Sequence, residues 1–185
     1  MCYNIKKRPK MKKLKELILF VSDLCKDDSE YGATKLNKIL FLVDFFAYSA
    51  YGKSITGATY FHLANGPAPK EMLRTQTALI AEGRADINER PYFGRTQKRL
   101  VALEGADMSI FSADELALVK DVIDHLRGIG GKRLSEWSHE LIPWLYTRDK
   151  EDIPYYTVFD LYSVPVRRDG IVWGQKELES LGKAA

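Results

Sequence analysis

Three histidines and two cysteines are the side chains of this sequence that could ligate a metal or act as nucleophiles: His62, His125, His139, Cys2 and Cys25. None of them lies three or four residues from another, the spacing that places two ligands on one helix face. His139-Glu140 begins like a metalloprotease helix, but the second histidine would be residue 143, which is proline. The sequence therefore predicts no metal site and no catalytic residue.

Two glycine-containing stretches, GKS at residues 52–54 and GIGG at residues 128–131, invite comparison with nucleotide-binding motifs. A phosphate loop needs a glycine five residues before the glycine of GKS, and this chain has Ala47 there. The GIGG stretch lacks both the spacing and the preceding strand of a dinucleotide fingerprint, and it is better explained as a helix stop. We expect no cofactor and no enzymatic activity.

The composition is that of a soluble globular protein, with 45% hydrophobic and 29% charged residues in a chain of 185. No segment approaches the roughly 18 consecutive apolar residues that a membrane helix requires. The two cysteines have no paired spacing, so a disulfide framework is not indicated. These features predict a cytoplasmic protein without a membrane partner.

Basic charge is concentrated at the N-terminus. Residues 1–15 hold seven of the 28 Lys and Arg residues and no acid, so the remainder has 21 bases against 25 acids although the formal net charge is +3. We interpret residues 1–11 as a basic, flexible tail. The alternative is an arm that binds nucleic acid or an acidic partner, through these candidates: Lys6, Lys7, Arg8 and Lys10.

Apolar residues recur at helical spacing in several segments. Helices are predicted at residues 12–26, in the run that ends before Gly52, at residues 67–82, after a capping box at residues 112–115, and at residues 134–141. In the second of these, Leu42 and Phe45 widen the apolar stripe beyond one face. That pattern predicts a central, largely buried helix.

Strands are predicted at residues 55–63 and in a hairpin at residues 85–103, whose loop is RPYFGR. Residues 153–173 are aromatic and proline-spaced, which indicates a short strand or an extended arm, and a weak helix follows. The expected fold class is α+β and predominantly helical, with five or six helices around the central helix and a small antiparallel sheet or hairpin. We expect the domain over residues 12–150, followed by a C-terminal extension, residues 151–185, that packs on it or binds a partner.

The stretch Asn65-Gly66-Pro67-Ala68-Pro69 is a rigid corner that suits neither a strand nor a helix. Its simplest interpretation is a turn that leads into the next helix. Because its backbone is fixed in advance, it could instead present a surface to a protein partner at low entropic cost.

The order helix, helix, strand, helix, hairpin is also that of a winged-helix module. In that interpretation residues 67–82 are the recognition helix, the hairpin tip is the wing, and four bases are available for phosphates: Arg74, Arg95, Lys98 and Arg99. Against it, the first two turns of the helix carry one base, and Glu71 would face the phosphates.

Two blocks of the sequence resemble the Panacea domain of SocA-like antitoxins. In the first, KLNKILF, YGK and Gly66-Pro67 correspond to the family's K-L-x-K-L-L-Y helix, Y-G-K-P-L turn and Gly-Pro corner. In the second, six residues correspond to its L-S-x-x-S/T-H helix and following P-W: Leu134, Ser135, Ser138, His139, Pro143 and Trp144. The likeness covers residues 34–144, with Ser54-Ile55 in place of the usual Pro-Leu and Asn65 in place of a large residue.

This resemblance implies a non-enzymatic antitoxin of a bacterial or phage toxin–antitoxin pair, a class connected with phage defence. It would neutralise a protein toxin encoded nearby by direct binding, with operator DNA as an alternative partner for an autoregulator. The variable terminal regions, residues 1–30 and 150–185, would select the toxin. The candidate residues for toxin contact are these: His62, Asn65, Gly66, Pro67, Trp137, His139, Trp144, Tyr155 and Tyr156.

For the corner itself we expect a structural joint, with a partner-binding groove as the alternative. In either case Gly66-Pro67 would hold His62 in a fixed relation to the helix that carries His139 and Trp144. A meeting of His62 and His139 in space is the one observation that would favour an enzyme.

Overall fold

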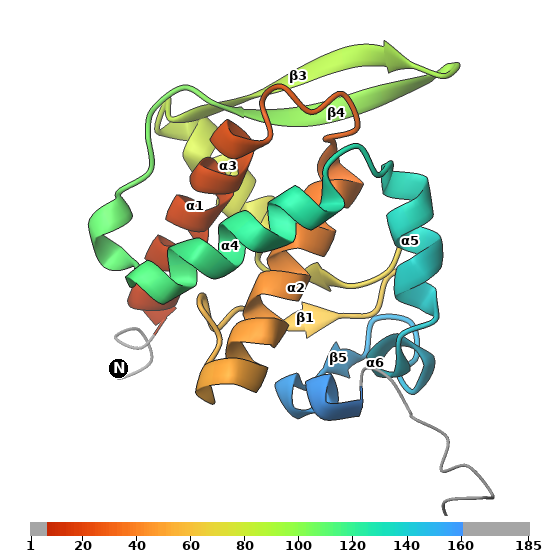
Figure 1. Cartoon of the computed structure of the whole chain (residues 1–185). Coiled ribbons are helices and arrows are strands. Elements are labelled where there is room, and N and C mark those ends of the chain that lie inside the picture. Colours follow the sequence, from red (N-terminus) through yellow and green to blue (C-terminus); the bar gives the residue numbers. More distant parts are fainter. Residues whose placement is uncertain (1–6, 161–185) are drawn as a thin grey trace, which may run out of the picture.

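A computed structural model describes residues 7–160 of the chain. It is α+β and predominantly helical, as predicted, with a small antiparallel sheet and a separate hairpin (Figure 1). The elements, in chain order, are α1 (Lys7–Leu24), α2 (Ala33–Tyr51), β1 (Tyr60–Phe61), β2 (Ala68–Pro69), α3 (Met72–Ala81), β3 (Ala85–Tyr92), β4 (Arg95–Ala102), η1 (Met108–Ile110), α4 (Ala113–Leu126), α5 (Gly131–His139), α6 (Ile142–Leu145), β5 (Asp152–Ile153) and η2 (Tyr155–Asp160).

Helix α2 is the centre of the molecule. It contacts α1, α4, α5, β2, β4 and η2, and most of its side chains are buried (Figure 1). The helix ends where Gly52 adopts a left-handed conformation, with φ of 69°, and donates its N–H to the Tyr48 carbonyl. The prediction of a buried central helix is therefore confirmed.

The three-stranded sheet differs from the prediction at the corner. Ala68–Pro69 pairs with β1 as an antiparallel strand, and α3 begins at Met72 rather than at residue 67. Proline is tolerated there because β2 is an edge strand of the order β2-β1-β5 and needs no outward N–H. The predicted strand 55–63 shortens to Tyr60–Phe61, because Thr56 bonds to a side chain of α2 instead of to a neighbouring strand.

The predicted hairpin is present and longer than expected. Pairing continues through most of RPYFGR to Tyr92 and Arg95, and the two strands lie across one end of the molecule, next to α1 and α3 (Figure 1). The capping box of α4 is also confirmed, since the Ser112 hydroxyl accepts from the Glu115 N–H and the Glu115 carboxylate accepts from the Ser112 N–H. The order of helices, strand and hairpin is the predicted one, with β2 inserted.

Several helices begin or end at other residues than predicted. Helix α1 begins at Lys7 instead of residue 12, and α5 spans Gly131–His139 instead of residues 134–141. Pro143, expected only as a stop, lies in the first turn of the short helix α6, where its missing N–H costs nothing. No helix among residues 7–160 is long and apolar enough to cross a membrane.

The first ten residues of the predicted extension pack on the domain. Strand β5 pairs with β1, and η2 contacts α2 and α6. The predicted C-terminal helix and the rest of the extension lie outside the described residues, as do residues 1–6.

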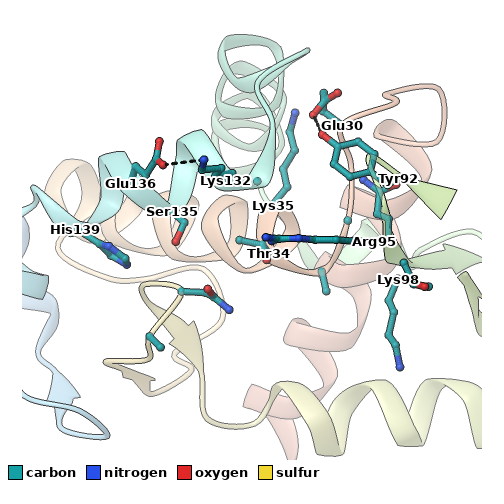
Figure 2. A pocket seen from close by; sticks show the side chains of 17 residues that line it. Glu30, Thr34, Lys35, Tyr92, Arg95, Lys98, Lys132, Ser135, Glu136 and His139 are labelled. Carbon is teal, nitrogen blue, oxygen red and sulfur yellow. Dashed lines mark hydrogen bonds and ion pairs between the residues drawn. The ribbon is translucent and has the colours of Figure 1, made fainter. Parts of the chain in front are cut away.

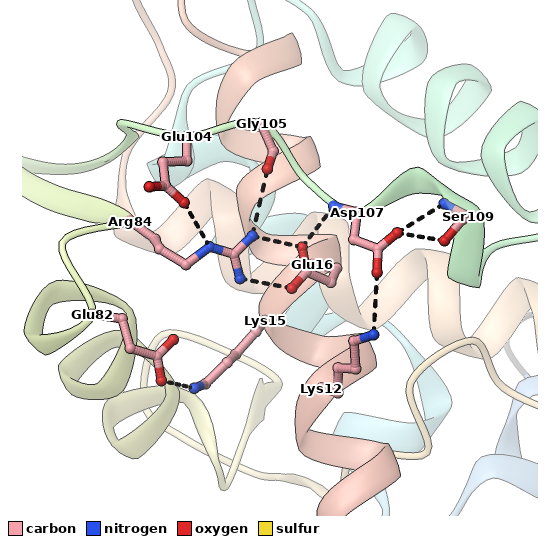
Figure 3. Close-up of polar contacts among 9 residues, drawn as sticks. All are labelled: Lys12, Lys15, Glu16, Glu82, Arg84, Glu104, Gly105, Asp107 and Ser109. Atoms are coloured by element: carbon pink, nitrogen blue, oxygen red, sulfur yellow. Dashed lines mark hydrogen bonds and ion pairs between the residues drawn. The ribbon is translucent and has the colours of Figure 1, made fainter.

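A buried ion pair ties α1 to the start of the hairpin. The Arg84 guanidinium donates to both carboxylate oxygens of Glu16, at 2.7 and 2.9 Å, and the Asp107 N–H donates to the same carboxylate (Figure 3). The hydrogen bond from Arg84 lowers the pKa of Glu16 despite its burial. Two further pairs, Lys12 with Asp107 and Lys15 with Glu82, extend the contact of α1 (Figure 3).

Asp44 is the polar centre of the core. Its fully buried carboxylate accepts from the N–H of Thr56 at 2.7 Å, from the Thr56 hydroxyl, and from the Tyr60 hydroxyl at 2.8 Å. The Tyr155 hydroxyl donates to the Ala58 carbonyl at 2.6 Å beside it. One side chain of α2 thus fixes the loop before β1, and the Tyr155 hydroxyl at the start of η2 lies 3.5 Å from the same carboxylate.

Replacement of Asp44 should change how stability depends on pH. Burial raises the pKa of Asp44 to about 6, above the value near 4 of an unfolded aspartate. The folded chain therefore binds this proton more tightly, and stability falls as the pH rises from about 4 through about 6. In urea unfolding, the free energy of unfolding of Asp44→Asn relative to that of wild type should rise by roughly 2 kcal/mol between pH 4 and pH 7.

The matched control for this prediction is Asp121→Asn, which alters an exposed carboxylate of α4. Its pH profile should run parallel to that of the wild type. A parallel profile for Asp44→Asn as well would show that Asp44 does not titrate in this window.

Candidate partner-binding groove

A groove of about 580 Å³ lies between the β3–β4 hairpin and α5 (Figure 2). The first turn of α2 forms its base, and the corner at Ala64 and Asn65 closes one end. Both α2 and α5 begin at the groove, and their N-cap residues, Gly32 and Gly130, provide no side-chain cap. Unsatisfied N–H groups at helix N-termini favour carbonyl and carboxylate groups.

The groove brings together residues from two separate predictions. Asn65 and His139, proposed for toxin contact, line it together with Arg95 and Lys98, proposed for nucleic acid. Local sequence patterns could not predict that these four side chains share one site, because the hairpin and α5 are brought together by tertiary packing on α2.

The groove wall is charged with both signs. Lys132 lies 3.8 Å from Glu136 one turn along α5, and Lys98 pairs with Glu89 of β3 at 3.1 Å. The Arg95 side chain extends across the groove toward Thr34 (Figure 2). In the described part of the chain Arg95 has no acidic partner within ion-pair distance, so its charge is available to a bound group.

Below the groove, the Gly66-Pro67 corner is held by a buried lysine. The ammonium of Lys38 donates to the carbonyls of Asn65 and Pro67, and burial lowers the pKa of Lys38 to about 7. Gly66 has φ of 87°, and a Cβ there would lie 2.2 Å from the Ser138 hydroxyl and 2.6 Å from the Lys38 ammonium. Glycine is therefore required by both the backbone and the space.

Trp144 lies between the two histidines. Its indole stacks on His62 with ring centroids 4.1 Å apart and on His139 with centroids 4.0 Å apart. The indole N–H donates to the Leu63 carbonyl at 3.3 Å, which connects α6 to the chain just before the corner. His139 ends α5 and Trp144 lies on α6, so these two residues are not on one helix as expected. The indole stacks on both imidazoles.

Each histidine has a distinct environment. The Thr147 hydroxyl donates to the Pro143 carbonyl at 2.8 Å and lies 3.1 Å from Nδ1 of His62. Burial, with the charges of Lys38 and His62, lowers the pKa of His139. Its Nε2 atom is buried and has no hydrogen-bond partner in the described chain. The described residues contain no group of three or more His, Cys, Asp and Glu placed to hold a metal ion.

The remaining aromatic candidates divide between core and surface. Trp137 packs against the core, and Tyr155 is held beside Asp44. Tyr156 is exposed, and with Tyr146 it lines a smaller pocket of about 420 Å³ near η2. This pocket lies at the α6–η2 end and shares no lining residue with the groove.

The bases proposed for nucleic acid do not form one surface. The Arg99 guanidinium is buried and donates to the carbonyls of Cys25 and Lys26 at the end of α1. Arg74 is exposed on α3, where Leu73 is also exposed. Lys6 and the side chains of Lys7, Arg8 and Lys10 lie outside what the structure describes.

Lys35 holds the backbone around the groove in place. The sequence identified it only as a match to the family motif, and did not predict this role. Its buried ammonium lies 2.6 Å from Asp28 and donates to the carbonyls of Leu126, the last residue of α4, and Ile129, just beyond it. The signal was a lysine within a helix whose apolar residues extend beyond one face, because a charged side chain buried in such a helix needs partners.

Substitution of Gly66 by alanine should destabilise the fold by about 2 kcal/mol or more, because the added Cβ meets atoms of Ser138 and Lys38 and the backbone is left-handed. Gly83→Ala is the matched control: Gly83 has φ of 69°, but nothing lies within 4 Å of its added Cβ. Urea midpoints should fall further for Gly66→Ala than for Gly83→Ala. Loss of partner binding with an unchanged midpoint would contradict the assignment of Gly66 as a joint.

A comparison with models of protein families identifies a family for this chain. The family model for "Antitoxin SocA-like, Panacea domain" matches residues 36–145, more than half of the chain. No curated protein and no solved structure matches the sequence. The matched region runs from the central helix α2 through α6, so it includes the Gly66-Pro67 corner, the hairpin and α5. The chain belongs to the SocA-like Panacea antitoxin family.

Proposed function

We propose that this protein is an antitoxin that neutralises a protein toxin encoded by a neighbouring gene, and that a segment of the toxin docks in the groove. Membership of the antitoxin family is the observation that carries the proposal. The groove supports it, because the domain's own packing provides a preformed cleft with polar groups of both signs.

Binding alone accounts for the proposed activity, without a catalytic step. The buried polar residues around the corner are occupied in holding the backbone: Lys38 bonds to two carbonyls, and Trp144 fills the space between His62 and His139. Groups fixed in this way present a rigid surface, which loses little conformational entropy when a partner docks.

The cell compartment and biological role belong to the same proposal. We infer action in the cytoplasm of a bacterium, with phage defence as the setting.

The free thiol of Cys25 is buried within the core, where burial raises its pKa to about 11, so it serves packing rather than reactivity. Binding of operator DNA by the N-terminal bases stays a prediction.

The decisive experiment expresses the product of each neighbouring gene alone and then together with this chain. A toxin should arrest growth when expressed alone, and co-expression of the wild-type chain should restore growth. The two proteins should also elute as one stoichiometric complex in high salt. If no neighbouring product arrests growth, or if growth returns without a complex, direct neutralisation is wrong.

Filling the groove should abolish neutralisation without unfolding the domain. Ser135 is half-buried on the groove wall of α5, so Ser135→Phe places a ring where the toxin segment is expected. Toxin affinity should fall at least tenfold and growth rescue should be lost, while the melting temperature stays within about 2 °C of wild type.

Arg133→Phe is the matched control, because residue 133 is exposed on the same helix and does not line the groove. This variant should retain full rescue. Equal rescue by both variants would move the toxin contact away from the groove, and the α6–η2 pocket would be the next surface to alter.

A further inference from the structure

The turn between β3 and β4 has a backbone that its sequence does not favour. Strand pairing ends at Tyr92 and Arg95, which leaves Phe93 and Gly94 as a two-residue turn. Both have positive φ, 44° and 74°, the pattern of a type I′ turn, whose first position favours Asn, Asp or Gly. A bulky residue in this conformation is strained. Folding alone would therefore favour Asn at position 93.

The same phenylalanine is almost completely exposed. Its relative accessibility is 88%, the highest among the large hydrophobic side chains of the described chain. The hydrophobic effect opposes this exposure, just as sterics oppose the backbone conformation. Two independent costs at one residue indicate that the ring is retained for a contact outside the folded monomer.

Neighbouring contacts hold the tip in place. The Tyr92 ring meets the Phe93 ring edge-on, with centroids 4.9 Å apart, and the Tyr92 hydroxyl donates to Glu30. Arg90 donates to the Ser29 carbonyl and also to the side chain of the facing residue Gln97, at 2.8 Å. The hairpin end is thus fixed to the loop before α2, so an incoming partner meets an ordered aromatic residue.

We propose that Phe93 is an anchor that inserts into an apolar pocket of the toxin, and that Arg95 pairs with an acidic group at the rim of that pocket. This inference rests on the proposed function. Tyr92 and Arg95, which flank the turn, both line the groove, so the tip stands at its edge and extends the same contact surface. Aromatic residues and arginine are the types that dominate protein-interface hot spots.

The charges near the tip favour a protein over nucleic acid as the partner. Lys98 pairs with Glu89, Arg90 is bound to the loop before α2, and Arg99 is buried. Arg95 is then the available cation at this end of the described hairpin, whereas a nucleic-acid wing neutralises several phosphates. One cation beside one aromatic ring matches a pocket with a single acidic group.

The test compares Phe93→Asn with wild type in two assays. The melting temperature should be unchanged or higher, because Asn suits the turn. Affinity for the neighbouring-gene toxin that the wild-type chain binds should fall at least tenfold. Leu103→Asn is the matched control: Leu103 is 61% exposed just beyond the other end of the hairpin, and its replacement should leave toxin affinity unchanged.

Each contrary result has a distinct meaning. A lower melting temperature for Phe93→Asn would show that Phe93 is a structural residue. An unchanged toxin affinity would show that Phe93 is not in the interface. Either result overturns the proposal that Phe93 is an anchor and leaves the proposed antitoxin function in place. Loss of a nuclease-sensitive complex instead of a toxin complex would assign the tip to nucleic acid and overturn the proposal. If no neighbouring product binds the wild-type chain, both the proposed function and the anchor fail. Phe93→Trp, which keeps an aromatic ring at the turn, should bind the toxin as wild type does.

Discussion

A single constraint organises this molecule: three ionisable side chains are buried on one central helix, and each must find partners within the fold. A buried charge without compensation costs several kcal/mol. Lys35 meets Asp28 and two carbonyls at the end of α4, Lys38 meets the carbonyls of the corner, and Asp44 meets Thr56 and Tyr60. The loops are placed by α2 because their backbone and hydroxyl groups are the partners that its side chains require.

The groove is a consequence of the same arrangement. Lys38 draws the Gly66-Pro67 corner against α2, and Gly66 leaves room for Ser138 of α5 to approach. Trp144 then fills the space between His62 and His139, which fixes α6 relative to the corner. The cleft is the space that remains between α5 and the hairpin, and its shape is set by groups beneath it.

Local patterns predicted much of this fold. The capping box at Ser112, the apolar width of α2 and the turn-flanked hairpin all identify their elements, because each depends on interactions within a short stretch of chain. The sequence could not show that Ala68–Pro69 would pair with β1, since that pairing depends on a neighbour brought in by tertiary packing. Likewise, Arg99 looks like a surface base until the end of α1 supplies the carbonyls that hold it.

The residues of the candidate site fall into two sets, one needed for folding and one exposed at the rim of the groove. The floor, at Lys38, Gly66 and Ser138, is bound up with folding, so almost any change there must be matched by another. The rim residues, such as Arg95 and Glu136, project from elements whose stability does not depend on them, and surface substitutions of this kind usually change stability by under about 0.5 kcal/mol. If the groove is the binding site, as proposed, selection for a new partner and selection for a stable domain can act on separate positions. Substitutions at the rim can then change the binding partner while the fold of the domain stays the same.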